Sequence, residues 1–168
     1  MVKKICFFTA ARSEYGIARP VLQRLQEDSE LQLQIVASGM HLSRRFGFSV
    51  MEILSDGFKI DKRIETLMET DSATAITKSI GLATIACAEA FHELQPDLLL
   101  LLGDRTELLA PASAALIANI PIGHIHGGEI TSSVIDDSVR HGLTKFSSMH
   151  FVATKRAKTR VLQLGECS

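Results

Sequence analysis

Five consecutive leucines, Leu98–Leu102, constrain the fold more than any other feature of this sequence. A run this short and this apolar is typical of a strand buried on both faces, which is how the strands of a parallel sheet are covered. Segments with strand and helix patterns alternate along the rest of the chain, and such alternation favours consecutive β-α-β units. The sequence therefore predicts an α/β fold in which helices cover both faces of a parallel sheet.

The individual elements are predicted from hydrophobic periodicity and from turn residues. Ser72 can cap the longest helix and Pro96 ends it, whereas Pro20 marks either the true first turn of the first helix or a kink. A loop is expected at 38–48. The expected strands are 5–9, 31–37, 58–62, 98–102, 121–125 and 149–153. The expected helices are 14–27, 49–55, 71–94, 106–118, 136–147 and 155–164.

Composition narrows the class of protein. The chain has 168 residues, of which 46% are hydrophobic and 22% charged, as in a globular domain. The net charge of −1 argues against nucleic acid as the main partner, and no apolar run reaches the roughly 18 residues of a membrane span. Cys6, Cys87 and Cys167 have no CxxC spacing, and an odd count without a framework fits a reducing, cytoplasmic location.

Charged and imidazole side chains follow the points where two expected strands end. Asp104 and Arg105 come directly after the leucine run, and His124, His126 and Glu129 surround the end of the next strand. Because ligands bind beyond the carboxyl ends of the strands in open α/β sheets, we expect an active-site rim here. A carboxylate at Asp104 can act as a base or cap the following helix, and both roles can coexist.

Other residues are expected near the same rim. Arg12 and Gly16 lie between the first strand and the first helix, where a helix N-terminus attracts anions, although Arg12 can equally be a surface residue. This turn lacks GxGxxG and is therefore not a dinucleotide fingerprint. His41 follows the second strand. Asp136 and Asp137 begin an expected helix, whose dipole they also suit.

The two histidines near the end of the 121–125 strand raise the question of a metal. His124 and His126 are two residues apart, which places them on one face of a strand. Together with the nearby carboxylates they could bind zinc or another divalent metal, but spacing this loose is weak evidence for a metal site. We therefore predict no metal and interpret His124 as a structural histidine. Gly127 and Gly128 indicate close backbone approach or positive φ, which places His126 and Glu129 on a tight turn.

Five segments, in order along the chain, resemble motifs of the hydrolysing UDP-N-acetylglucosamine 2-epimerases of sialic and legionaminic acid biosynthesis. They are AARSEYG, SGMHLS, LLLGDRTE, HIHGGE and IDDSVRHGLTK. Family members are longer and have a two-domain, GT-B-like fold. The resemblance thus implies that residues 1–168 are the Rossmann-like N-terminal domain, without the C-terminal nucleotide-binding domain. The chain stops at Ser168 directly after a helical pattern, which we interpret as an interrupted gene or an isolated domain.

The resemblance also implies a reaction that uses neither a nicotinamide nor a metal cofactor. A base removes the proton on C2 of a UDP-sugar, UDP leaves C1, and water adds to the resulting glycal to give the 2-epimer. Asp104 and Asp136 match family carboxylates proposed for acid/base catalysis. The residues that this resemblance and the expected rim assign to substrate binding are Arg12, Gly16, His41 and Arg105.

One position departs from the sialic-acid branch of the family. That branch commonly has Glu where this sequence has His126. The His form is more similar to the branch that acts on UDP-2,4-diacetamido-2,4,6-trideoxy sugars on the way to legionaminic acid. The third acid/base group is therefore either His126 or Glu129.

Three other functions remain open at this point: the N-terminal half of a GT-B glycosyltransferase, a non-catalytic fragment whose cleft face mediates association, and a metal hydrolase built on His124 and His126. The set of Asp104, His126 or Glu129, and Asp136 favours elimination chemistry over glycosyl transfer. The family resemblance suggests a UDP-sugar substrate and a homodimer. We expect little or no epimerase activity from this chain alone.

Overall fold

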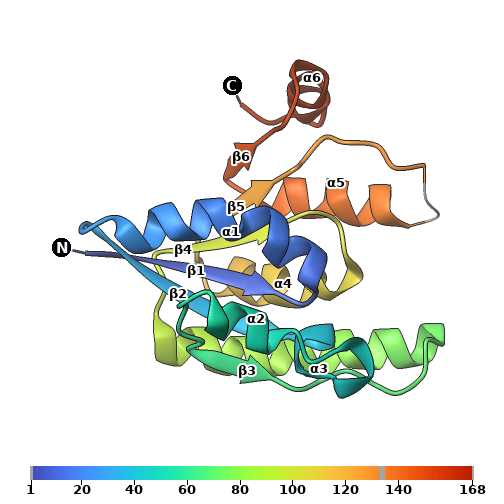
Figure 1. Ribbon diagram of the computed structural model, residues 1–168. Coiled ribbons are helices and arrows are strands. Elements are labelled where there is room, and N and C mark those ends of the chain that lie inside the picture. The colour runs from blue at the N-terminus through green and yellow to red at the C-terminus, as the bar shows by residue number, and fades with distance from the viewer. Residues whose placement is uncertain (1, 133–134, 168) are drawn as a thin grey trace.

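The computed structural model describes residues 2–132 and 135–167 of the chain. Within these residues, the strands form a six-stranded parallel sheet in the order β3-β2-β1-β4-β5-β6 (Figure 1). The α/β fold with a Rossmann-like parallel sheet is thus confirmed. The strands are β1 Lys3–Thr9, β2 Leu31–Ser38, β3 Lys62–Ile64, β4 Leu98–Leu102, β5 Ile122–Ile125 and β6 Met149–Phe151.

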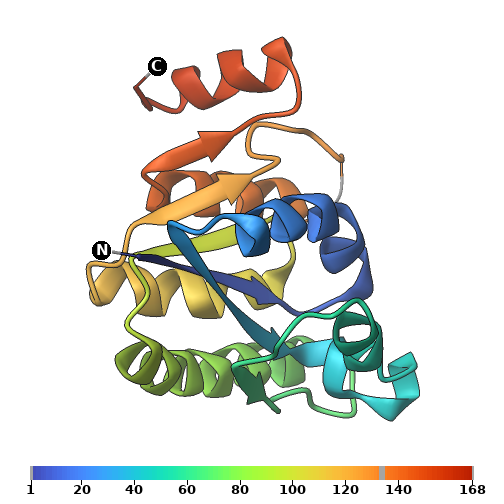
Figure 2. The same ribbon diagram turned by 60° about the vertical axis from the view of Figure 1, so that its left-hand side comes forward.

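Helices lie on both faces of this sheet. One face is covered by α3, α4 and α5 and the other by α1 and α2, while α6 lies beside β6 at one edge (Figure 2). No helix in the described part of the chain is both long and apolar enough to cross a bilayer. The helices are α1 Arg12–Glu27, α2 Val50–Ser55, α3 Ala73–Leu94, α4 Leu109–Ile117, α5 Asp136–Phe146 and α6 Lys155–Gln163, with 3₁₀ turns η1 Gly39–Leu42, η2 Arg44–Phe46 and η3 Thr106–Leu108.

The leucine run forms the centre of the core. Leu99 and Leu101 of β4 pack on one side of the sheet with Phe91 of α3, and Leu100 packs on the other side with Leu22 of α1. Each fully buried leucine contributes about 1.5–3 kcal/mol of hydrophobic free energy. The prediction of a strand covered on both faces is therefore confirmed, and this strand anchors the polar residues that follow it.

The short strand predicted at 58–62 lies at Lys62–Ile64 instead. Phe58 does not join the strand because its side chain, only 3% exposed, packs into the core beside α2. The Asp61 carboxylate accepts the backbone N–H of Ile35 at 2.9 Å, in addition to a backbone bond between the same residues. The paired ladder of β2 and β3 consequently begins with Lys62 opposite Val36.

The first helix begins at Arg12 rather than at Glu14, and Pro20 lies inside it rather than in its first turn. Glu14 explains this start. Its Oε2 accepts the backbone N–H groups of Ala10 at 2.8 Å and Ala11 at 3.2 Å. The first N–H groups of a helix have no partner within the helix. The Glu14 carboxylate supplies an acceptor for backbone N–H groups at the point where α1 begins.

The remaining elements are close to their predicted ranges, with local differences. The predicted helix 106–118 is divided into η3 and α4, and the predicted loop 38–48 contains η1 and η2. Ser72 caps α3 as predicted, because its Oγ accepts the N–H of Ala75 at 3.2 Å. The three cysteines are free, with Cys6 and Cys87 buried, and the cytoplasmic location stays a prediction.

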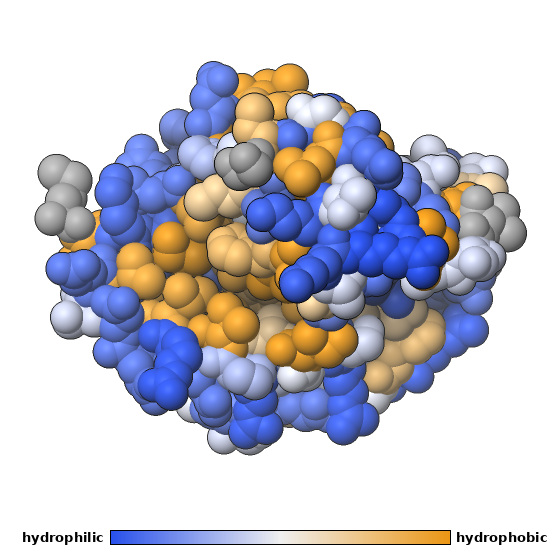
Figure 3. Space-filling view, turned by 90° about the horizontal axis from the view of Figure 1, so that it is seen from above, coloured by the Kyte–Doolittle hydropathy of each residue, from blue (hydrophilic) through white to orange (hydrophobic). Residues whose placement is uncertain are grey.

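The surface beside the β6 edge mixes apolar and polar side chains. Figure 3 looks down on β6 and α6 and shows apolar side chains, in orange, exposed between hydrophilic ones, in blue. Met149 and Phe151 of β6 are 41% and 50% exposed, and Leu162 of α6 is 38% exposed. The homodimer suggested by the family resemblance stays a prediction.

Candidate active site

The strand order determines where a ligand can lie. The chain fills the sheet outward from β1 in one direction with β2 and β3, and in the other direction with β4, β5 and β6. The connections after β1 and β4 therefore diverge and leave a crevice beyond the carboxyl ends of these two neighbouring strands. The segments that flank the crevice are 10–14, after β1, and 103–107, after β4.

A pocket of about 800 Å³ occupies this position. Its volume is within the range of about 300–1,000 Å³ that is usual for small-molecule sites. Five connections supply its walls. Four of them follow β1, β4, β5 and β6, the one after β5 leading into α5, and the fifth leads into α3. The lining residues are Ser13, Glu14, Ile17, Ile76, Leu102, Gly103, Asp104, Arg105, Thr106, Glu107, His126, Glu129, Ile130, Thr131, Ile135, Asp136, Arg140 and Ala153.

Asp104 lies in this pocket and forms an ion pair with Arg140. Its side chain is 22% exposed, so one side of the carboxylate faces the pocket while Arg140 Nη2 donates to Oδ2. The predicted alternative, a helix cap, is not what the structure has, because the cap residue of η3 is Arg105 and no side chain caps this turn. The guanidinium favours the ionised form of Asp104.

Arg140 holds several parts of the site together. It is 4% exposed, and its Nη1 donates to the Glu129 carbonyl oxygen at 2.7 Å and to Asp137 Oδ1 at 3.0 Å. Asp137 also accepts the backbone N–H of Thr131, and this hydrogen bond lowers the pKa of its carboxyl group. The loop after β5, the start of α5 and the end of β4 are thus joined through one buried guanidinium.

Glu14 is a pocket residue that the sequence did not reveal. It is 4% exposed, and burial raises its pKa to about 7, although the backbone N–H groups of Ala10 and Ala11 favour the charged form. Its Oε1 lies 3.8 Å from Arg105 Nε, and neither atom has a hydrogen-bond partner among the described residues. The position of Glu14 after β1 predicted only the start of a helix. Its burial could not be predicted, because it depends on Arg105 and on the loop after β2, which are distant in the sequence.

Arg105 stands at the middle of the crevice. Its Nη2 donates to Glu107 Oε1 at 2.7 Å, and the same nitrogen lies 3.9 Å from the sulfur of Met40. The side chain is 32% exposed, so a cationic group is available at the pocket wall. A guanidinium in this position suits an anionic ligand such as a diphosphate.

His126 lines the pocket, and the turn that carries it is tightly constrained. His126 has φ +66° and Gly128 has φ +77°, as expected for a tight turn with positive φ. A Cβ on Gly128 would lie 2.3 Å from the carbonyl oxygen of Ala157 in α6. The Gly128 carbonyl also accepts Arg160 Nη1 at 2.8 Å, so α6 shapes the turn from outside the pocket.

The prediction that His124 and His126 share a face rested on strand alternation, which does not extend to His126. β5 ends at Ile125, and the positive φ of His126 turns its side chain away from the strand alternation. His124 is fully buried, with Nε2 2.7 Å from the Gly103 carbonyl oxygen and Nδ1 3.2 Å from Thr144 Oγ1. Burial lowers its pKa to about 4, so it is the structural histidine that the sequence predicted.

Glu129 and Asp136 complete the acidic wall of the pocket. Asp136 is the first residue of α5, where the helix dipole favours an anionic side chain. Glu129 Oε1 accepts a long hydrogen bond of 3.4 Å from Thr154 Oγ1. In the described part of the chain, no three His, Cys, Asp or Glu side chains are grouped so that they could hold a metal ion.

Three residues that the sequence placed at the rim lie outside the lining of this pocket. Arg12 is exposed and pairs with Glu52 at 2.9 Å, and Gly16 is exposed on α1. His41 is fully buried, with Nε2 3.0 Å from Thr9 Oγ1 and Nδ1 2.8 Å from Ser49 Oγ. Both ring nitrogens of His41 therefore support the loop after β2, and the roles of these three residues in binding stay predictions.

Comparison with known proteins agrees with this geometry. The family model described as UDP-N-acetylglucosamine 2-epimerase matches residues 23–168. This chain belongs to that family. The match includes β4 and β5, the loops after them and the start of α5, which supply most of the pocket.

Similar proteins extend the match. The chain is 44% identical over 164 residues to the hydrolysing GDP/UDP-N,N'-diacetylbacillosamine 2-epimerase of Campylobacter jejuni. The alignment covers 98% of this chain and 42% of that protein. It is 42% identical to the hydrolysing UDP-N,N'-diacetylbacillosamine 2-epimerase of Legionella pneumophila, over 99% of this chain and 44% of that protein. A Neisseria meningitidis UDP-GlcNAc 2-epimerase, solved bound to UDP-GlcNAc, superposes with a TM-score of 0.85 at 22% identity, over 98% of this chain and 44% of that one. This chain thus spans less than half the length of these relatives.

Proposed function

We propose that this chain is the N-terminal domain, residues 1–168, of a hydrolysing UDP-sugar 2-epimerase and supplies its acid/base groups. The observation that carries the proposal is that Asp104, from the connection after β4, and His126 and Asp136, from the two ends of the connection between β5 and α5, line one pocket at the sheet's switch point. Three acid/base groups around one site suit proton removal at a carbon next to a leaving group. A glycosyl transfer needs no proton removal at C2.

The proposed reaction begins with the removal of the C2 proton by a carboxylate. The electron pair of the C2–H bond forms a C1=C2 double bond while the C1–O bond breaks, and UDP leaves with the electrons of that bond. Water then adds across the glycal, with its hydroxyl group at C1 and a proton delivered to C2 from the opposite face. The products are the 2-epimer and free UDP.

Each pocket residue has a role in this proposal. Asp104, which pairs with Arg140, is suited to act as a base, and Asp136 is the second carboxylate. His126 or Glu129 supplies the third group, which protonates C2 or the leaving oxygen. Arg105, whose side chain is 32% exposed at the pocket wall, contacts the UDP-sugar in this proposal.

The substrate that we propose is a UDP-2,4-diacetamido-2,4,6-trideoxy sugar. His126 supports this assignment, as does the identity of 42–44% to relatives named for UDP-N,N'-diacetylbacillosamine. A UDP-N-acetylglucosamine 2-epimerase of Neisseria meningitidis is only 29% identical. The remaining contacts to the nucleotide are expected from the part of the relatives that this chain does not cover.

A chimeric protein tests this function. This chain is joined to the C-terminal part of the Campylobacter jejuni relative and incubated with the UDP-diacetamido sugar in D₂O. We expect release of UDP and a 2-epimer that carries deuterium at C2. The Asp104→Asn chimera is expected to lose both signals when it is assayed well below its melting temperature, which the loss of the ion pair with Arg140 lowers. A sugar transferred without deuterium at C2 would show a glycosyltransferase instead.

A further inference from the structure

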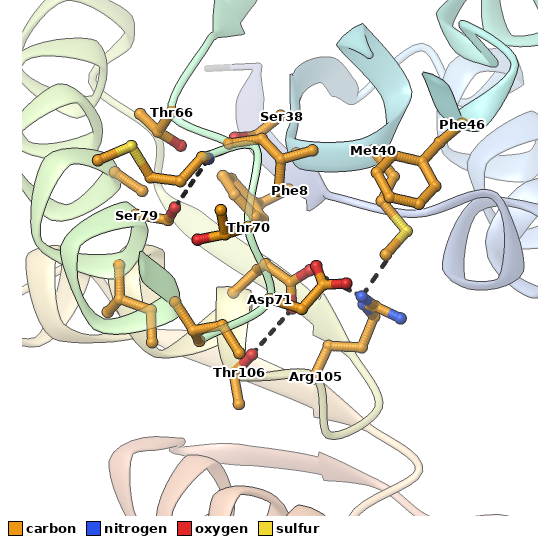
Figure 4. Close-up of a pocket in the computed structure, with 17 residues that line it drawn as sticks. Phe8, Ser38, Met40, Phe46, Thr66, Thr70, Asp71, Ser79, Arg105 and Thr106 are labelled. Atoms are coloured by element: carbon orange, nitrogen blue, oxygen red, sulfur yellow. Dashed lines mark hydrogen bonds and ion pairs between the residues drawn. The ribbon is translucent and has the colours of Figure 1, made fainter. Parts of the chain in front are cut away.

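A second, smaller cavity adjoins the active-site pocket (Figure 4). It has a volume of about 140 Å³ and lies between the loop after β2, the loop that follows β3 and the first half of α3. In Figure 4, Arg105 reaches from one side of this cavity toward the sulfur of Met40 on the other. Its lining includes Phe8, Met40, Phe46, Leu67, Met68, Ile76, Ile80 and Ala83.

The cavity shares a wall with the active-site pocket. Ile76, Arg105, Thr106 and Glu107 line both spaces. Asp104, the proposed base, directly precedes this shared segment and faces the larger pocket. A ligand held by the acidic groups of the larger pocket can therefore extend one substituent past Arg105 into the smaller cavity.

The inside of the cavity is apolar but retains a hydrogen-bonding group. Leu67, Met68 and Ile76 are each 38–39% exposed, so the cavity presents apolar surface that a ligand could cover. Ser79 Oγ already accepts the backbone N–H of Met68 at 3.1 Å. A hydroxyl group can also donate a hydrogen bond, so the Ser79 hydroxyl can donate to a carbonyl oxygen of a ligand.

The volume limits what the cavity can hold. Sites for whole small molecules usually occupy about 300–1,000 Å³. At about 140 Å³, this cavity suits one short substituent of a larger ligand rather than a sugar ring or a nucleotide. A short acylamino group has the matching chemistry, since it combines a small apolar methyl group with one carbonyl acceptor.

We propose that this cavity receives the acylamino group at C4 of the sugar and thereby selects 4-acylamino UDP-sugars over UDP-N-acetylglucosamine. This inference rests on the proposed function, because that function places C1 and C2 beside Asp104, His126 and Asp136. C4 lies across the six-membered ring from C1. A substituent on C4 therefore points away from the acidic groups, toward the far side of the Arg105–Glu107 segment.

Methyl NMR of the unmodified chain tests the binding place. The probes are UDP-2,4-diacetamido-2,4,6-trideoxyglucose and UDP-N-acetylglucosamine, each added at millimolar concentration. We expect both sugars to shift the amide signals of Gly103 and His126, and only the diacetamido sugar to shift the methyl signals of Met68 and Ile80. Equal shifts of these methyl groups with both sugars, or none with either, would overturn the inference.

A filled cavity tests selectivity. Ala83 is buried against the cavity, so Ala83→Leu occupies its space, whereas the matched Ala88→Leu places the same side chain at an exposed site on the same helix. In the chimera, we expect Ala83→Leu to lower kcat/KM for the diacetamido sugar about tenfold or more, the scale of discrimination by a carbon or two in an apolar pocket. Turnover of UDP-N-acetylglucosamine should change less than about twofold, and Ala88→Leu should change neither.

The outcomes separate the two proposals. A chimera that turns over neither UDP-sugar contradicts the proposed function and the inference with it. An active chimera in which Ala83→Leu lowers both activities equally contradicts the inference alone. If Ala83→Leu prevents folding, the methyl NMR experiment on the unmodified chain still decides the question.

Discussion

At the scale of single residues, the site is organised by two charged side chains whose partners are far away in sequence. Arg140 joins Asp104, Asp137 and the Glu129 carbonyl, and Glu14 is buried beneath Arg105. The role of Arg140 could not be predicted from the sequence, because its contact with Asp104 spans 36 positions. Residues that directly follow a buried strand, such as Asp104, were predictable.

Removal of the Arg140 guanidinium is expected to destabilise the fold. Hydrogen bonds to charged groups contribute about 1.5–3 kcal/mol each, and Arg140→Met leaves Asp104 and Asp137 without their cation. Because both carboxylates keep access to water, we expect a loss of about 2–3 kcal/mol in the free energy of unfolding rather than the larger loss of a fully buried pair. Urea denaturation measures it.

The control for this prediction is Arg24→Met, which removes an exposed pair with Glu27 at 3.5 Å. Exposed pairs of this kind contribute little, so the urea midpoint of this variant should stay unchanged. Equal midpoints for Arg140→Met and Arg24→Met would show that Arg140 does not hold the site together.

The raised pKa of Glu14 predicts that the stability of the fold depends on pH. Burial raises its pKa to about 7 in the folded chain, above the ordinary 4.5. The folded state therefore binds more protons than the unfolded state between these values, and its stability falls as pH rises through that window. We expect the wild-type chain to lose stability from pH 5 to pH 7.5 relative to Glu14→Gln, measured by urea denaturation at both pH values. Parallel profiles of the two proteins would contradict the raised pKa.

At the scale of elements, periodicity and turn residues predicted most helices and strands, and the errors have local causes. The strand at 58–62 was misplaced because Phe58 is used for the core and Asp61 bonds to the backbone of β2. The prediction that His124 and His126 share a face assumed a strand through residue 126, but β5 ends at Ile125 and His126 begins the turn with a positive φ. Hydrophobic pattern alone does not show where a strand stops.

The turn after β5 should be sensitive to one added methyl group. Gly128→Ala requires φ +77° and places Cβ against the Ala157 carbonyl, so α6 or the turn must move. The left-handed conformation alone costs about 1–2 kcal/mol for a residue with a side chain. We expect at least this loss in thermal or urea unfolding, together with weaker ligand shifts at His126.

Gly142→Ala serves as the comparison for that variant. Gly142 lies inside α5, and a Cβ there meets no atom within 4 Å. Alanine in a helix interior is favoured over glycine by about 0.5–1 kcal/mol, so this variant should be slightly more stable than the wild type. A Gly128→Ala protein as stable as Gly142→Ala would mean that the turn and α6 are not tightly joined.

At the scale of the whole molecule, the sheet order explains why one rim collects the chemistry. The chain adds strands to the sheet in opposite directions on either side of the β1–β4 pair, which brings five connections to one crevice. The fold class and the rim were predictable from the alternation of elements. The adjoining cavity was not, since it depends on how the loops after β2 and β3 fold against α3.

The isolated chain is expected to bind the UDP-sugar weakly and to release little or no UDP. It covers only 42–44% of the Campylobacter jejuni and Legionella pneumophila relatives, so contacts to the nucleotide should be missing. An assay of UDP release, run in parallel on the chain and on the chimera at equal concentration, measures the difference. Equal rates would show that the first domain is sufficient for turnover.

The contact between the turn after β5 and α6 also has a consequence for the order in which the protein matures. Gly128 packs against Ala157 of α6, which the ribosome adds later, so the turn that carries His126 can take its final shape only after α6 has docked. We therefore expect the part of the pocket wall that His126 forms to be completed only once synthesis has passed residue 157.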